Sequence, residues 1–410
     1  MLLLAARSGT SPAPATARSA VPAAALDSSE EFGVNAGVMF NGGRYTRAQI
    51  DAQLASLART GATVVRSDAL WEDSEPNPPL GILHRYNWTL DDLIVSSLAH
   101  HGLRWLPIID YSTPWARAVP GQIHSPPSSV SEFASFAAAV ASRYGPGGSF
   151  WLENPGLKPL PALTYEIWNE PDNPAFWYPS PNPAAYANLY GAARGAILSK
   201  QAGAHVIIGG LTRPAWFVAN MLAADPGLRG QIDGVAIHPY AATPNRVFAG
   251  VRSARLAINS DGLAAVPLYV TEVGWTTHGQ GVRDSATAAE RPGYISETVS
   301  TLAHSDCGIA GVMLYTWTTP DRNPANPQDW FGISPPGAGP SRDTAAFTAA
   351  LQAAELPAPP ALLCTTNLAL VDTRVLPVAP PKRDTRPSGR RCRRSVKRQA
   401  RCRRTAKRRA

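Results

Sequence analysis

The chain has 410 residues, of which 44% are hydrophobic and 17% charged, and its formal net charge is +8. The C-terminal residues 382–410 hold 15 of the 38 Lys and Arg residues but one acidic residue, which leaves 23 basic and 29 acidic residues elsewhere. A mildly acidic body of this length and hydrophobicity can bury a large core. This composition excludes a chain disordered throughout and argues against a nucleic-acid-binding body.

Residues 1–30 form either a leader or a disordered segment. They begin with an apolar run, Leu2–Ala6, and continue with Ala, Pro, Ser and Thr. The run is too short to span a membrane, and no basic residue precedes it as in a complete signal peptide. We expect no transmembrane segment, and we expect a secreted or cell-surface protein because of the function argued below.

Residues 31–356 alternate short apolar runs with amphipathic, Ala-rich stretches. The predicted strands lie near Gly33–Phe40, Thr63–Leu70, Arg104–Tyr111, Leu163–Asn169, His205–Leu211, Gly234–Tyr240, Leu268–Trp275 and Gly311–Trp317. The predicted helices are Ala48–Leu54, Val130–Tyr144, Ala184–Gln201, Trp216–Ala224, Val247–Ile258, Glu290–Ala303 and Thr344–Ala354. Eight such units, without a Gly-x-Gly-x-x-Gly sequence after the first strand, predict an α/β fold of the (β/α)₈ TIM-barrel type.

The C-terminal residues differ in character from the predicted barrel. Residues 357–381 are rich in Pro and predict an extension or linker, and residues 382–410 predict a disordered basic tail. The tail carries no aromatic residue for base stacking, so an anionic cell-wall polymer is a better partner than nucleic acid, and a solvated tail without a partner remains open. The four cysteines lack the paired spacing of a zinc site, and a Cys307–Cys364 disulfide is one of the possible pairings.

Two glutamates occupy the positions where barrel enzymes carry their catalytic groups. Glu170 follows the fourth predicted strand, and Glu272 lies near the end of the seventh. Active sites of TIM barrels lie at the carboxyl ends of the strands. Retaining glycoside hydrolysis needs one protonated and one ionised carboxyl group about 5–5.5 Å apart, and strands four and seven can place two carboxyl groups across the barrel mouth. The pair therefore predicts a retaining glycosidase.

The sequence Trp168-Asn169-Glu170-Pro171, together with Thr271-Glu272, resembles the pattern of glycoside hydrolase clan A. It is most similar to family 39 and to cellulase-like members of family 5. The resemblance implies that Glu170 is the acid/base, that Glu272 is the nucleophile and that Asn169 binds the substrate 2-hydroxyl.

The same resemblance implies roles for residues on other strands. Arg66 would hold the nucleophile ionised, the His238-Pro239-Tyr240 sequence would place Tyr240 beside Glu272, and Trp317 would form the floor of the sugar subsite. The resemblance covers roughly residues 33 to 354.

Several of these residues also have structural interpretations. Glu166 lies four residues before Glu170 and suits a buried salt bridge rather than catalysis. Arg66 could instead pair with Asp68 or Glu72 at the rim, and His238 could contact substrate or support Tyr240. Asp110 and Tyr111, which end the third predicted strand, are further candidates for substrate contact.

Tryptophans after the predicted strands are candidates for stacking on sugar rings, or for packing of loops onto the barrel. They are Trp71, Trp115, Trp177, Trp275 and Trp330. The sequence thus predicts a hydrolase that cleaves O-glycosidic bonds of a β-linked oligo- or polysaccharide by double displacement. It acts as an endo-β-glycanase or in a β-xylosidase-like manner, with no metal or cofactor. The alternative is a catalytically weak carbohydrate-binding barrel held at the cell surface by its tail.

Overall fold

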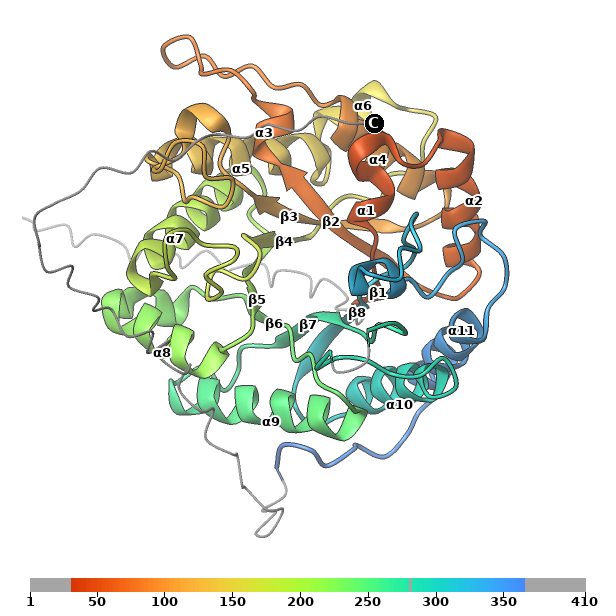
Figure 1. The fold of residues 1–410 in the computed structure, drawn as a ribbon. Helices are drawn as coiled ribbons and strands as arrows, with labels where there is room; N and C mark the ends of the chain where they lie inside the picture. Colours follow the sequence, from red (N-terminus) through yellow and green to blue (C-terminus); the bar gives the residue numbers. More distant parts are fainter. Residues whose placement is uncertain (1–30, 280–281, 366–410) are drawn as a thin grey trace, which may run out of the picture. The chain divides into compact units, whose positions relative to one another are not determined.

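The structure, a computed structural model, describes residues 31–279 and 282–365. Eight parallel strands close into a barrel in the order in which they occur in the chain, β1 to β8 (Figure 1). The strands are β1 Glu31–Asn35, β2 Val64–Leu70, β3 Arg104–Asp110, β4 Thr164–Ile167, β5 His205–Leu211, β6 Gly234–Ile237, β7 Leu268–Val273 and β8 Ile309–Leu314. The predicted TIM barrel is confirmed.

A ring of helices surrounds the barrel (Figure 1). These helices are α2 Arg47–Ala58, α4 Thr89–His100, α5 Val130–Tyr144, α7 Pro183–Lys200, α8 Pro214–Ala224, α9 Pro244–Ser260, α10 Arg291–Ala303 and α11 Arg342–Ala354. The α4 helix is not among the predicted ranges. No side chain caps its first turn, so the usual start signal of a helix is missing there.

Short helices and 3₁₀ turns lie in the loops between the main strands and helices. They are α1 Gly37–Phe40, η1 Asn41–Gly43, α3 Trp71–Ser74, η2 Pro114–Ala116, α6 Ser149–Glu153, η3 Pro226–Gly230 and η4 Pro327–Trp330.

Several predicted strands are longer than the observed ones: β1 ends at Asn35 and β8 at Leu314. In both cases the chain turns into a loop as soon as pairing with the neighbouring strands stops. The residues beyond these ends therefore lose the strict alternation of a strand.

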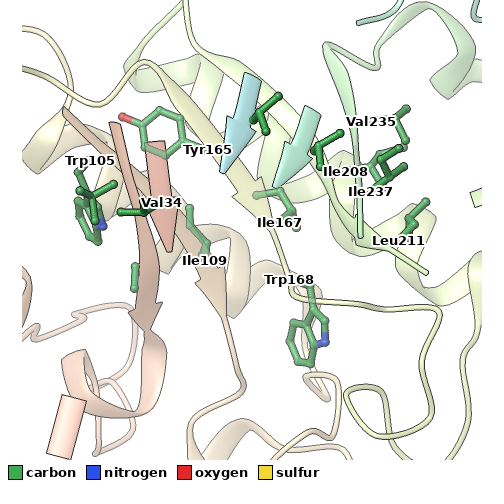
Figure 2. Packing of buried hydrophobic residues seen from close by; sticks show 14 of the residues in the cluster. Val34, Trp105, Ile109, Tyr165, Ile167, Trp168, Ile208, Leu211, Val235 and Ile237 are labelled. Atoms are coloured by element: carbon green, nitrogen blue, oxygen red, sulfur yellow. The ribbon is translucent and has the colours of Figure 1, made fainter. Parts of the chain in front are cut away.

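Alternation along the strands separates two sets of side chains. On β3, Trp105 and Ile109 belong to the large cluster between the sheet and the helices, and Figure 2 shows them with their counterparts on neighbouring strands. Leu106 instead packs inside the barrel with Val64 and Met313. Residues two apart from Leu106 along β3 therefore also point toward the barrel axis. The inward-facing side chains near the carboxyl ends of the strands form the functional site.

The two adjacent glycines of β5 leave space for the neighbouring strands. A Cβ atom on Gly209 would lie 2.0 Å from the carbonyl oxygen of Trp168, and one on Gly210 would lie 1.9 Å from Nε2 of His238. Side chains of any size are therefore excluded there, because β4 and β6 contribute the groups that fill this side of the barrel.

A disulfide between Cys307 and Cys364 fastens the residues after α11 to the barrel. Next to it, the carboxylate of Asp306 accepts hydrogen bonds from the backbone amides of Leu363 and Cys364, at 2.8 and 2.7 Å. This pairing was one of those left open, and it is now confirmed.

The rest of the Pro-rich extension, the basic tail and residues 1–30 lie outside the described residues. Within the described part, no helix is both long enough and apolar enough to cross a membrane.

Candidate active site

A cavity of about 410 Å³ opens at the carboxyl ends of the strands. We call it the catalytic cavity because both candidate glutamates, Glu170 and Glu272, line it. Its other lining residues are Asn35, Gly37, Val38, Asn41, Arg66, Ser67, Asp68, Leu70, Glu72, Ile108, Tyr111, Ile123, His124, Asn169, Phe176, Tyr315 and Thr316. Its size lies within the range of sites for small organic ligands.

Glu272, on β7, is held by two side chains from other strands. Nη1 of Arg66 donates to its Oε1 at 2.6 Å, and the hydroxyl of Tyr240 donates to its Oε2 at 2.8 Å. A cation and a hydroxyl donor both stabilise the ionised carboxylate and fix its orientation. The structure therefore brings Arg66 and Tyr240 to the residue that the sequence paired them with.

Arg66 is itself buried, with 1% of its side chain exposed. Glu166 accepts two parallel hydrogen bonds from its guanidinium, at 2.7 and 2.8 Å, and Asn35 and Asn169 accept two more. The salt-bridge interpretation of Glu166 is confirmed. The pairing of Arg66 with acids at the rim is not what the structure shows, because the guanidinium points to Glu166 and Glu272.

Glu170 follows β4 and has different partners. His238 Nδ1 lies 2.8 Å from its Oε1, and the amide of Asn173 donates to its Oε2 at 2.6 Å. Burial raises the pKa of Glu170, but the hydrogen bond and the charge of His238 outweigh it and lower the pKa overall. Burial in turn lowers the pKa of His238, and the charge of Glu272 with the hydrogen bond to Glu170 raises it overall. Each of the two groups therefore favours the charged form of the other.

The backbone around Glu170 adopts a conformation that most side chains avoid. Trp168 has φ 66° and Glu170 has φ 44°, both in the left-handed region. Packing compensates for this strain, because the Trp168 side chain is fully buried and its indole N–H donates to the carbonyl of Phe176 at 2.7 Å. Strain of this kind collects at functional sites, where it aims a side chain at its target.

His238 lies behind the catalytic cavity. Its side chain has no exposed surface, it does not line the cavity, and its Nε2 lies 3.1 Å from the Thr271 hydroxyl. Of the two roles considered for this residue, the structure favours support: His238 bridges Glu170 and the strand that carries Glu272.

The nearest carboxylate oxygens of Glu170 and Glu272 lie within 4.8 Å of each other, and His238 Nδ1 lies within the same distance of both. Three such atoms could also hold a metal ion. However, both oxygens of Glu272 are already engaged by Arg66 and Tyr240, and a buried guanidinium repels a second cation. The geometry therefore fits a carboxylate pair better than a metal centre.

No protein-family model matches the sequence, and no curated protein matches it. Solved structures do match the fold. They include a family 39 glycoside hydrolase from Bacteroides cellulosilyticus WH2 (TM-score 0.58, 20% identity, covering 78% of this chain and 64% of that one). A monomeric β-xylosidase from Caulobacter crescentus CB15 gives a TM-score of 0.59, with 18% identity over 78% of this chain and 67% of that one.

A GH5_18 enzyme from Streptomyces cattleya, in complex with GlcNAc, matches with a TM-score of 0.59 and 18% identity, over 80% of this chain and 82% of that one. The chain shares the fold of these glycoside hydrolases. The resemblance to families 39 and 5 is thus confirmed at the level of the fold. The chain covers 64% of the length of the Bacteroides enzyme, so the activity of that enzyme is not transferred with the fold.

Most of the tryptophans considered as sugar platforms belong to the core instead. Trp177 and Trp275 are 2% and 1% exposed, and the indole N–H of Trp275 donates to the carbonyl of Ala241 at 2.8 Å. Trp115 packs edge-on against Trp71, with ring centroids 5.3 Å apart. These four residues therefore do not offer a ring face to the catalytic cavity, and the predicted substrate contacts of Trp115, Trp177 and Trp275 are corrected to packing.

Trp330, like Trp115, is half-buried; it is stacked on His278 with centroids 4.7 Å apart, and it does not line the cavity.

Trp317 is also corrected. Its side chain is fully buried and does not line the cavity, whereas Tyr315, two residues earlier, does. Since β8 ends at Leu314, both residues lie in the following loop, where alternation no longer tells which side chain faces inward. Tyr315 is therefore the aromatic residue that this loop presents to a ligand.

Other residues in or next to the cavity carry weaker sequence signals. Asn173 holds Glu170 and lies three residues after it, at a spacing that a turn brings together. Asp68 lies two residues after Arg66, on the same side of β2, and it lines the cavity instead of pairing with that arginine. Tyr111, considered from the sequence, lines the cavity, whereas Asp110 is buried beneath it.

Proposed function

We propose that this protein is a retaining glycoside hydrolase that cleaves β-linked glycans, with Glu272 as the nucleophile and Glu170 as the acid/base. The observation that carries the proposal is the separation of the two carboxylates, whose nearest oxygens lie within 4.8 Å. Inverting enzymes need about 6.5–9.5 Å between their carboxyl groups to accommodate a water molecule, and retaining enzymes about 5–5.5 Å. The short separation favours direct attack by one carboxylate.

The different partners of the two carboxylates assign their roles. Arg66 and Tyr240 hold Glu272 as an oriented anion, which suits a nucleophile. Glu170 instead has a second titratable group, His238, as its partner at 2.8 Å, which suits a group that changes its protonation state during the reaction.

In the first step, an oxygen of Glu272 attacks the anomeric carbon, and the bond from that carbon to the leaving oxygen breaks. Glu170 protonates the leaving oxygen and is left as a carboxylate, which His238 Nδ1 stabilises from 2.8 Å. In the second step, Glu170 takes a proton from water, which attacks the anomeric carbon and releases Glu272. The β configuration is restored because the carbon is inverted twice.

The substrate of the proposed reaction is a β-linked oligo- or polysaccharide, cleaved in an endo- or β-xylosidase-like manner. The names of two similar structures, a β-xylosidase and a GH5_18 enzyme bound to GlcNAc, support a pyranose substrate. A carbohydrate-binding barrel without catalysis is the weaker alternative, since it gives no reason for two strand-end glutamates within 4.8 Å of each other.

We further propose that the protein is exported. The Cys307–Cys364 disulfide supports this, because such bonds persist in oxidising compartments. The 15 Lys and Arg residues among residues 382–410 would then favour contact with an anionic cell-wall polymer.

The proposal is tested by incubating the wild type, Glu272→Gln and Glu170→Gln with a panel of β-glycans and aryl β-glycosides. NMR follows the anomeric configuration of the first product. We expect a β product from the wild type and a loss of about 10³-fold or more in kcat for Glu272→Gln. An α product formed first would indicate inversion and would overturn the assignment of Glu272.

Aryl glycosides whose leaving groups differ in acidity distinguish the role of Glu170 from that of Glu272. Glu170→Gln should lose about 10²- to 10⁴-fold on substrates with a poorly acidic leaving group, and little in the first step for a dinitrophenyl glycoside, which leaves without a proton. Glu153→Gln, a matched change of an exposed glutamate on α6, is the control and should leave activity unchanged. A wild type that binds glycans but cleaves none would support the binding-protein alternative.

A further inference from the structure

The catalytic cavity contains a carboxylate that the proposed reaction does not use. Asp68 lies near the end of β2, two residues beyond Arg66, and faces the same side of the strand. The Asn41 side chain donates to its Oδ2 at 3.3 Å, and a Cβ atom on Gly37 would lie 2.9 Å from the same oxygen. The loop after β1 is thus shaped around this carboxylate and leaves it facing the cavity.

Asp68 is the cavity carboxylate with the least compensation. Glu272 has Arg66, Glu170 has His238, and Glu72 has Arg117 at 2.5 Å. Within residues 31–279 and 282–365, no ion pair involves Asp68, and its side-chain donor is the single long hydrogen bond from Asn41. A partly buried carboxylate in this condition has lone pairs available for the donors of a ligand.

A second carboxyl group lies directly beside it. Asp110 at the end of β3 is 0% exposed, and neither of its oxygens has a hydrogen-bond partner among the described residues. It is two residues beyond Ile108, which lines the cavity and pairs with Asp68 across the two strands, so Asp110 points toward the same interior.

Burial, reinforced by the charge of Asp68, raises the pKa of Asp110 well above its usual range. Burial also raises the pKa of Asp68. These two acids at one end of the cavity lack the donors that buried polar groups normally have.

We propose that Asp68 is a specificity-determining residue, which accepts hydrogen bonds from ring hydroxyls of the sugar whose anomeric carbon lies at Glu272. The proposal rests on the proposed function and deepens it by naming the substrate class at this subsite, a neutral sugar with free hydroxyls. A uronic acid is disfavoured because its carboxylate would face Asp68 and Glu272 together.

The test combines variants of the protein with variants of the substrate. The probes are the best aryl β-glycoside of the wild type, each of its monodeoxy analogues, and the aminodeoxy and uronate relatives of the same sugar. They are compared by kcat/KM on the wild type, Asp68→Asn and Asp68→Ala. One deoxy position should cost the wild type about 10- to 100-fold, since a hydrogen bond to a charged group is lost. The same deletion should cost Asp68→Ala less than about threefold.

This non-additivity separates recognition from a structural role, which would lower activity on all analogues alike. Asp73→Asn, an exposed acid on α3, serves as the control and should show the wild-type pattern. Thermal unfolding of Asp68→Asn, an isosteric change, checks that the fold is kept.

Equal costs of every deoxy position in the wild type and Asp68→Ala would overturn the proposal. So would a preference of the wild type for the aminodeoxy sugar or the uronate that Asp68→Asn loses. A wild type that cleaves neither a β-glycan nor an aryl β-glycoside would instead refute the proposed function on which this inference rests.

Discussion

Two neighbouring parts of the barrel interior are built from opposite kinds of side chain. At the carboxyl end, Arg66, Glu166 and Glu272 form a charged network that is nearly sealed from solvent. Next to it, Leu106, which pairs with Arg66 in the sheet, packs with Val64 and Met313 in a small apolar cluster. A buried ion pair gains little over apolar packing of the same volume, so the charged end is not needed for stability. Its cost is understandable only if the charges serve a reaction.

The largest effect should come from breaking the charged end. Glu166→Gln leaves the buried Arg66 with half of its charge compensation, and we expect a loss of about 3–5 kcal/mol in the free energy of unfolding, measured by urea titration. Glu153→Gln removes an exposed partner of Arg143 and should cost at most about 1 kcal/mol. Equal losses in the two variants would contradict the stabilising role assigned to the buried pairing of Glu166 with Arg66.

The apolar cluster of Val64, Leu106 and Met313 should respond in stability alone. Met313→Ala removes a fully buried side chain from this cluster and should destabilise the protein by about 2–5 kcal/mol. Because none of the three residues lines the catalytic cavity, kcat per folded molecule should stay at the wild-type value. A drop in kcat of more than about threefold, with the fold intact, would show that the cluster and the catalytic cavity are coupled.

The disulfide lies at the amino end of the barrel strands, because Cys307 comes just before β8. It closes a loop with a sequence separation of 57 residues, for which chain entropy predicts about 4 kcal/mol, and the double variant Cys307→Ser/Cys364→Ser should lose about 2–4 kcal/mol. Unfolding of the wild type with and without a reductant gives an independent measure. No change in either experiment would mean that the unfolded chain is not constrained by this bond.

The smallest effect concerns pH. The pKa of Glu170 is lowered by His238, so His238→Ala should let this pKa rise and move the alkaline limb of kcat/KM to higher pH, by on the order of one unit. The sign follows because the first step needs Glu170 protonated. The exposed His205 provides a control, since His205→Ala should leave the profile unchanged. A limb that moves to lower pH would contradict the assignment of the acid.

The sequence predicted the barrel well because its strands are apolar runs separated by amphipathic helices, and this pattern depends on burial alone. It also placed Glu272, which is paired into β7 as its penultimate residue, whereas Glu170 lies three residues beyond β4 and was found through the sequence Trp168-Asn169-Glu170-Pro171. It was wrong about Trp275 and Trp317, which lie beyond the last paired residue. There the direction of a side chain depends on tertiary packing, and sequence position carries no information about it.

The sequence could not show that Asp68 is free to bind a ligand, for a related reason. Its position on β2 predicts that it faces the barrel interior with Arg66, so an ion pair between them is the simplest expectation. The structure shows that Glu166 and Glu272 compete for the same guanidinium and take it. Which of several neighbouring acids an arginine selects is decided by distances across the barrel, which one sequence does not contain.

The fastening of residues after α11 has a practical consequence for attachment. The described chain ends at Thr365, whose amide donates to Asp306 just before β8, at the end of the barrel opposite the catalytic cavity. A fluorophore or solid support attached at Thr365 itself would therefore lie on the side of the barrel away from the entrance to the cavity, which long polymeric substrates would use.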